Sequence, residues 1–298
     1  MKQQFCIIIG IIMLFLCFNV PVFSADWKTQ PGEHPFLLVK KEDYEDLRNR
    51  MNRSPWKELG ESAISNAKNL PITTTGSYTT RSFYHRQVVS STALAYILDP
   101  DNRDYYMERL ISIIGQWSED SEYNLYDELY KKSDSWSNAI PPGGAFVNAV
   151  LAFDIIYDDI PSIADRTRLE NALGKVAKHY YDVPEGHTVG IISVPGTWAL
   201  FQRDYKLARE CYDEYLSHFD PYMTKDGVGV IATQYANSRF VSNSSNSKLI
   251  MPLIMDYTGQ DTTFFKNLKY INFAEWLLGY TYTPTSERWI IGDTEPAD

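Results

Sequence analysis

The stretch AFVNAVLAFDIIY, residues 145–157, decides the fold class, because it is apolar on nearly every side and carries a single acidic residue. A helix without a polar face is buried all round. Two further stretches, VVSSTALAYIL at 88–98 and KLIMPLIMDY at 248–257, have the same character. The sequence therefore predicts inner helices at these three places, which other helices must cover.

Between these stretches, apolar residues recur on one side only, as Tyr106, Leu110, Ile113, Ile114 and Trp117 do. Such spacing is typical of an amphipathic helix with one buried face. The same pattern occurs at Tyr44, Leu47 and Met51, at Trp56, Leu59, Ala63 and Ile64, at Leu169, Leu173, Val176 and Tyr180, at Ala208, Cys211, Tyr212, Tyr215 and Phe219, and at Phe264, Leu268 and Ile271. The chain thus alternates inner and outer helices.

The joints between these helices repeat. YILDPDNRDYY, LFQRDYKLA and MDYTGQDTTFF each run from an apolar helix through a short turn with aspartate into an amphipathic helix. Repeated helical hairpins of this kind build an α/α toroid or solenoid. We expect residues 25–298 to form one all-α domain, an incomplete (α/α) toroid of inner and outer helices. Pro252 should either kink or start its helix.

The first 24 residues, MKQQFCIIIGIIMLFLCFNVPVFS, have one lysine, an apolar run and then small residues. This pattern is typical of a secretory signal peptide cleaved after Ser24. An uncleaved membrane anchor is the alternative, but the run is short for a bilayer span. We expect a secreted or periplasmic protein that does not associate with a membrane after cleavage.

Charge and cysteine content narrow the possible partners. Loss of Lys2 with the signal peptide takes the formal net charge from −10 to −11, whereas nucleic-acid binding requires a broad basic surface. Nucleic acid is therefore not expected as a partner. Of three cysteines only Cys211 remains after cleavage, and its helical spacing predicts a packed core thiol. No pair of histidines has the spacing that zinc ligands prefer, so we expect no metal site.

The loops expected before the inner helices are rich in polar and aromatic residues. They are TTTGSYTTRSFYHRQ, SDSWSNAIPPGGAFVN and VPEGHTVGIISVPGTWALFQ. In a ring of inner and outer helices these loops share one end, where side chains converge on a central cleft. The candidate catalytic residues are His85 and His187, with a helix-capping role as the alternative for His85. The candidate sugar-binding residues are Tyr84, Arg86, Gln87, Asn148, Trp198 and Gln202.

A further candidate site lies in DGVGVIATQYANSRF, residues 226–240, where Tyr235 is close to Gln234, Asn237 and Arg239. A neighbouring guanidinium favours the phenolate, so such a tyrosine can act as general acid or base. β-Elimination at a uronic acid needs a base, an acid and a group that neutralises the carboxylate, and none of these must be a carboxylic acid. The alternative for Tyr235 is a buried tyrosine that bonds to the backbone.

A glycoside hydrolase requires two facing carboxylates instead. The available carboxylates are Asp154, Asp158, Asp159, Asp134, Glu287 and Asp293, but the sequence context of most of them is that of turn or cap residues.

Several stretches together resemble the heparinase II/III-like and alginate-lyase-like polysaccharide lyases. They are HPFLLVKKEDYEDLRNRM, HRQVVSSTALAYILDPDNRDYYMERL, GGAFVNAVLAFDIIYDDI, PGTWALFQRDYKLAREC, DGVGVIATQYANSRF and RWIIGDT. The resemblance implies an α/α toroid, an anionic polysaccharide as substrate and β-elimination without a redox cofactor. It also implies that Tyr235 is the counterpart of the family's catalytic tyrosine.

Two features depart from that family. Many members have Asn or Asn-His before Gly-Thr, whereas Ser193, Val194 and Pro195 precede Gly196 and Thr197 here. Such lyases also continue into a C-terminal β-sandwich, which we expect to be missing from this chain. The leading hypothesis is a polysaccharide lyase. The alternatives are a non-catalytic glycan-binding module and an α/α-toroid glycoside hydrolase.

Overall fold

The structure is a computed structural model that describes residues 33–121, 125, 136–182, 188–219 and 249–272. These residues form helices and their connections, with no β-strand among them. The all-α prediction is confirmed for this part of the chain. The α-helices are α2 (Tyr44–Arg50), α3 (Trp56–Asn69), α4 (Tyr78–Leu98), α5 (Arg103–Gly115), α7 (Trp136–Ile156), α8 (Ile163–Asp182), α9 (Thr188–Phe201), α10 (Tyr205–Phe219) and α12 (Ile250–Tyr257). The 3-10 helices are η2 (Lys41–Asp43), η3 (Pro100–Asn102), η4 (Tyr157–Asp159) and η6 (Phe264–Lys266).

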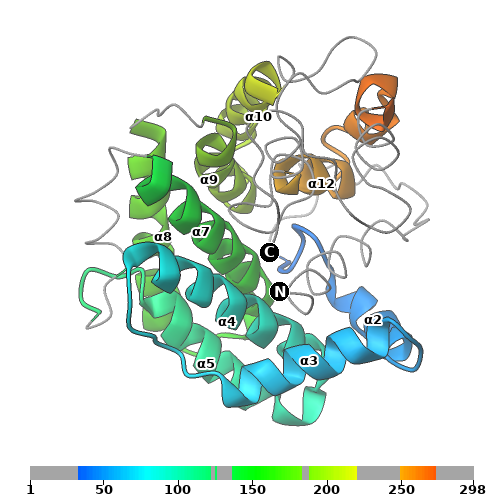
Figure 1. The fold of residues 1–298 in the computed structure, drawn as a ribbon, viewed down its shortest axis with the longest axis vertical. Helices are drawn as coiled ribbons and strands as arrows, with labels where there is room; N and C mark the ends of the chain where they lie inside the picture. The colour runs from blue at the N-terminus through cyan, green and yellow to red at the C-terminus, as the bar shows by residue number, and fades with distance from the viewer. Residues whose placement is uncertain (1–32, 122–124, 126–135, 183–187, 220–248, 273–298) are drawn as a thin grey trace, which may run out of the picture.

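The α-helices form an inner row and a set that covers it (Figure 1). Helices α4, α7 and α9 lie side by side in that order, and α12 follows α9. Helices α3 and α5 pack on α4, α8 and α10 pack on α9, and α5 also contacts α8. The apolar stretches around 88–98, 145–157 and 248–257 therefore all belong to the inner row.

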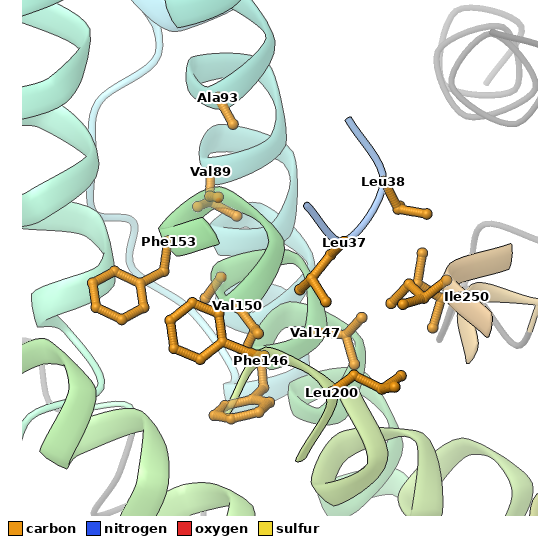
Figure 2. Close-up of a cluster of buried hydrophobic side chains, with 14 of the residues drawn as sticks. Leu37, Leu38, Val89, Ala93, Phe146, Val147, Val150, Phe153, Leu200 and Ile250 are labelled. Atoms are coloured by element: carbon orange, nitrogen blue, oxygen red, sulfur yellow. The ribbon is translucent and has the colours of Figure 1, made fainter. Parts of the chain in front are cut away.

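The core lies where the inner row meets its neighbours, as Figure 2 shows for side chains from several elements. Val89 of α4, Phe153 of α7, Leu200 of α9 and Ile250 of α12 are all buried, and Leu37 from the leading segment joins them. Each buried apolar side chain of this size contributes about 1.5–3 kcal/mol relative to an exposed one. Burial on this scale holds the inner row together.

Two inner helices begin earlier than the sequence indicated. Helix α4 starts at Tyr78, where Ser77 caps it by accepting a hydrogen bond from the Thr80 backbone N–H. Helix α7 starts at Trp136 and runs through the Pro-Pro-Gly-Gly segment at 141–144, because its packing against α4 and α9 outweighs these local helix breakers. Residues expected in loops, including Tyr84 to Gln87, are therefore helical and lie beyond the first turn of α4.

The last predicted amphipathic stripe is wrong. Phe264 is buried in η6, but Leu268 is 71% exposed and Ile271 is also exposed. Pro252 is the third residue of α12, so it starts this helix instead of kinking it.

The leading segment, residues 33–40, is attached to the carboxyl-terminal part of α7. The buried Asp154 carboxylate accepts hydrogen bonds from His34 Nδ1 at 2.6 Å and from the backbone N–H groups of Phe36 at 3.0 Å and Leu37 at 2.9 Å. The next residues reach α12, where the Tyr257 hydroxyl donates to Asp43. This segment therefore joins helices that are far apart in sequence.

Candidate functional site

Helices α4 and α7 share a groove on the face of the inner row. Ser90 and Leu94 of α4 line it together with Asn148, Leu151 and Ile155 of α7. All five side chains are half-buried. We call this set the α4–α7 groove. It encloses a cavity of about 100 Å³, which Leu38, Val39 and Leu47 close at one end.

A fixed pair of polar side chains bridges the two helices within the groove. The Ser90 hydroxyl donates to Asn148 Oδ1 at 2.8 Å, and Asn148 Nδ2 donates to the Gly144 carbonyl at 2.7 Å. These bonds leave one N–H of the Asn148 amide and the lone pairs of the Ser90 oxygen for a ligand. The pair is therefore preorganised to bind a hydroxyl group.

Arg86 precedes the groove, toward the amino-terminal end of α4. Residues 86, 90 and 94 are spaced by four, so Arg86 lies in one row with Ser90 and Leu94, one turn or about 6 Å before Ser90. Gln87 lies beside it and is half-buried. Arg86 and Gln87 thus remain candidates for ligand binding at the polar end of this groove.

The guanidinium of Arg86 is unusual because it is desolvated and has no anionic partner. Its Cζ atom lies 5.2 Å from the centroid of the Phe83 ring, and burial lowers its pKa to about 10. Within the described part of the chain, Arg86 forms no ion pair and no hydrogen bond. Burying a charge without a partner costs free energy. An anion bound beside the guanidinium would recover this free energy.

His85 lies on a different side of α4, in the core next to α5. Its side chain is 1% exposed, and Nε2 donates to the Ile113 carbonyl at 3.1 Å. Nδ1 is buried without a hydrogen-bond partner, and the ring packs edge-on against Trp117 at 5.4 Å. Burial lowers the pKa of His85 to about 4. The location is that of a neutral core histidine that does not open to the groove, and its hydrogen bond reaches a carbonyl in the last turn of α5.

Tyr84 also points away from the groove. Its hydroxyl donates to the Pro71 carbonyl at 2.8 Å, which ties α4 to the connection after α3.

Trp198 and Gln202, also predicted to bind sugar, lie at the carboxyl-terminal end of α9 and face α8. Trp198 stacks on Phe201 at 5.1 Å and lies against Gly174, and Gln202 Nε2 donates to Glu170 at 2.9 Å. The structure therefore does not bring them together with Arg86. They were expected in a loop before an inner helix, but they follow most of that helix.

The remaining predicted site residues, Tyr235, Gln234, Asn237, Arg239 and His187, lie outside the described residues.

Of the carboxylates considered for a hydrolase, Asp154, Asp158 and Asp159 anchor the leading segment and η2, and Asp134, Glu287 and Asp293 lie outside the described residues. Asp154 accepts three hydrogen bonds, as described above, and Asp158 accepts from the His34 backbone N–H at 2.7 Å. Asp159 accepts from Lys41 at 2.8 Å and from the Tyr96 hydroxyl at 2.5 Å. Burial raises the pKa of Asp159, but these two hydrogen bonds, together with the positive charges of Lys41 and Arg103, outweigh it and hold the pKa below its ordinary value. These three residues act as structural anchors.

Sequence reasoning missed the apolar part of the groove. It treated 88–98 and 145–157 as buried on all sides, whereas Ser90, Leu94, Asn148, Leu151 and Ile155 are half-buried. A signal was present, because Arg86, Ser90 and Leu94 have the four-residue spacing of a single helix face.

Comparison with known proteins identifies no relative: the sequence matches no protein-family model and no curated protein. Across the described ranges, no three His, Cys, Asp or Glu side chains gather in a way that could hold a metal ion. In the same ranges, no helix combines the length and apolar character needed to cross a membrane.

Proposed function

We propose that this chain is the helical part of a secreted polysaccharide lyase, an α/α toroid that cleaves a uronic-acid-containing polysaccharide by β-elimination. The observation that carries the proposal is the unpaired, half-buried guanidinium of Arg86, which lies one turn before Ser90 and the α4–α7 groove. Arginine binds carboxylates through two parallel hydrogen bonds, and each uronic acid offers one carboxylate.

The reaction requires this charge neutralisation. A base removes the C5 proton, the C4–O4 bond breaks as the C4=C5 double bond forms, and O4 takes up a proton. Negative charge develops on the carboxylate as C5 loses its proton, so a cation already placed there stabilises the transition state. We assign this task to Arg86. Buried His85 has no direct part in it.

The proton transfers are assigned to Tyr235, whose acidity the nearby Arg239 would increase. Gln234 and Asn237 would hold the sugar, and His187 would assist. These assignments rest on the sequence pattern and on the family resemblance. They supply the proton transfers and the sugar contacts that Arg86 alone does not provide.

One observation favours a second candidate, a glycan-binding module without catalysis. Ser193 and Thr197 flank the place where many lyases of that family carry Asn or Asn-His, and both are fully buried within α9. The Thr197 hydroxyl donates to the Ser193 carbonyl at 2.7 Å, and Gly196 packs against Met251 and Cys211. This segment therefore offers no polar side chain to a ligand.

The experiment that separates the two candidates measures product formation. The full chain is incubated with a panel of uronic-acid polysaccharides, and ultraviolet absorbance reports the unsaturated uronate that only elimination produces. We expect Arg86→Gln to lower kcat/KM by about 100-fold, Tyr235→Phe to abolish turnover, and Arg53→Gln to have no effect. Arg53 is the matched control because it is exposed and carries the same charge.

If the polysaccharide binds but no unsaturated uronate absorbance develops, the chain is a glycan-binding module. Cleavage without the chromophore would indicate a hydrolase instead.

A further inference from the structure

The α4–α7 groove has two chemically different ends. The Ser90–Asn148 pair forms its polar end, and Leu94, Leu151 and Ile155 form its apolar end. Arg86 lies outside the groove lining, one turn before Ser90 on the same row of α4, and about 12 Å along the helix from Leu94. A ligand that spans Arg86 and the groove would therefore be anionic at one end and apolar at the other.

The apolar end is poorly suited to an unsubstituted sugar. Ile97 and Leu38 complete its wall, and both are buried. Among the described residues that line the cavity, the one charged side chain is Asp154, whose carboxylate already accepts hydrogen bonds from His34 and two backbone N–H groups. A sugar hydroxyl placed there would lose its hydrogen bonds to water without replacement. A methyl group would gain free energy by leaving water.

We infer that the groove binds a uronic-acid glycan in which a sugar next to the uronate carries a methyl-terminated substituent, either an O-acetyl group or the methyl of a 6-deoxy sugar. The uronate carboxylate pairs with Arg86, a hydroxyl meets the Ser90–Asn148 pair, and the methyl group enters the cavity beside Leu94 and Leu151. The separation of the two ends places the carboxylate and the methyl group on neighbouring sugars. This inference rests on the proposed function, because it takes the anion to be a uronate.

Paired ligands and direct binding test this inference on the full chain. Isothermal titration calorimetry compares an O-acetylated oligouronate with the same preparation after alkaline deacetylation. A second pair compares an oligouronide that contains a 6-deoxyhexose with one that contains the corresponding hexose. We expect at least one methyl-bearing ligand to bind about tenfold more tightly than its partner. The pair that shows the preference identifies the source of the methyl group.

Two variants test which residues produce the preference for the methyl-bearing ligand. Leu94→Phe fills the cavity while it stays apolar, so we expect it to remove the preference for the methyl-bearing ligand. Arg86→Gln should weaken both members of a pair by the same factor, because it acts on the carboxylate alone. Circular dichroism of each variant confirms that the helices are intact.

The outcomes separate this inference from the proposed function. A preference for the methyl-bearing ligand without the elimination chromophore supports the inference and removes the lyase. Elimination with equal affinities within both pairs keeps the lyase and overturns the inference. Absence of binding to all four ligands overturns both.

Discussion

Protonation of His85 should destabilise the fold at mildly acidic pH. In the unfolded chain a histidine titrates near its ordinary pKa of 6.5, whereas burial lowers the pKa of His85 in the folded protein to about 4. Between these values the unfolded state binds a proton that the native state excludes, so stability falls as pH falls from 6.5 to 4. Each pKa unit corresponds to 1.36 kcal/mol. The expected loss between pH 7 and pH 4.5 is therefore about 2–3 kcal/mol from this residue alone.

The assay is urea unfolding of the full chain, followed by circular dichroism at intervals from pH 7.5 to 4.5. His85→Gln is the informative variant, because the glutamine amide can still donate to the Ile113 carbonyl but does not titrate. It should be less stable than the parent protein at pH 7, and the difference should shrink by about 2–3 kcal/mol at pH 4.5.

His179→Gln is the control, because burial lowers the pKa of His179 too, but its side chain is half-buried and not in the core. That variant should retain most of the pH dependence of the parent. A difference between the parent and His85→Gln that stays constant across the pH range would refute the reasoning.

Three further predictions concern stability and use the same unfolding assay. Asp154→Asn should lower the free energy of unfolding by about 2–4 kcal/mol, because it removes the charge that accepts three hydrogen bonds. Asp158→Asn changes an exposed carboxylate and should lower it by less than about 1 kcal/mol. Equal losses would contradict the anchoring role of Asp154. Gly196→Ala should lower the free energy of unfolding by about 1–3 kcal/mol, because the new Cβ would lie 2.4 Å from the Met251 side chain. Gly174→Ala has its nearest contact at 3.5 Å, so it should stabilise α8 by about 0.5–1 kcal/mol. Arg86→Met should raise stability by about 1 kcal/mol, because it removes a desolvated cation without a partner; a loss of stability would show that Arg86 has a structural role.

The helical framework could be predicted because its signals are local. The stripe of Tyr106, Leu110, Ile113 and Trp117 is fully buried as its spacing indicated, and Cys211 is the packed core thiol that was expected. Burial also raises the pKa of Cys211 to about 12. Both features follow from which face of a helix is apolar, and the spacing of side chains along a single helix determines that face.

The candidate site was predicted less well, for two physical reasons. Helix boundaries depend on packing, so Tyr84 to Gln87 were expected in a loop although they lie inside α4 and point in different directions. Trp198 and Gln202 were assigned to the amino-terminal end of an inner helix, but they lie at its carboxyl-terminal end against α8. In both cases the residue types suggested a binding site, but the neighbouring sequence did not determine where the residues lie relative to the helix ends.

The sequence by itself determined the all-α class and the positions of the inner helices, because hydrophobic periodicity reports which helices have no polar face. Only the tertiary structure decided which sides of these helices meet. Around a helix without a distinct polar face, such as α4, the local pattern does not specify which neighbour covers each face. Packing placed His85 in the core against α5, whereas the adjacent Arg86 is only half-buried, on the same row of α4 as Ser90 and Leu94.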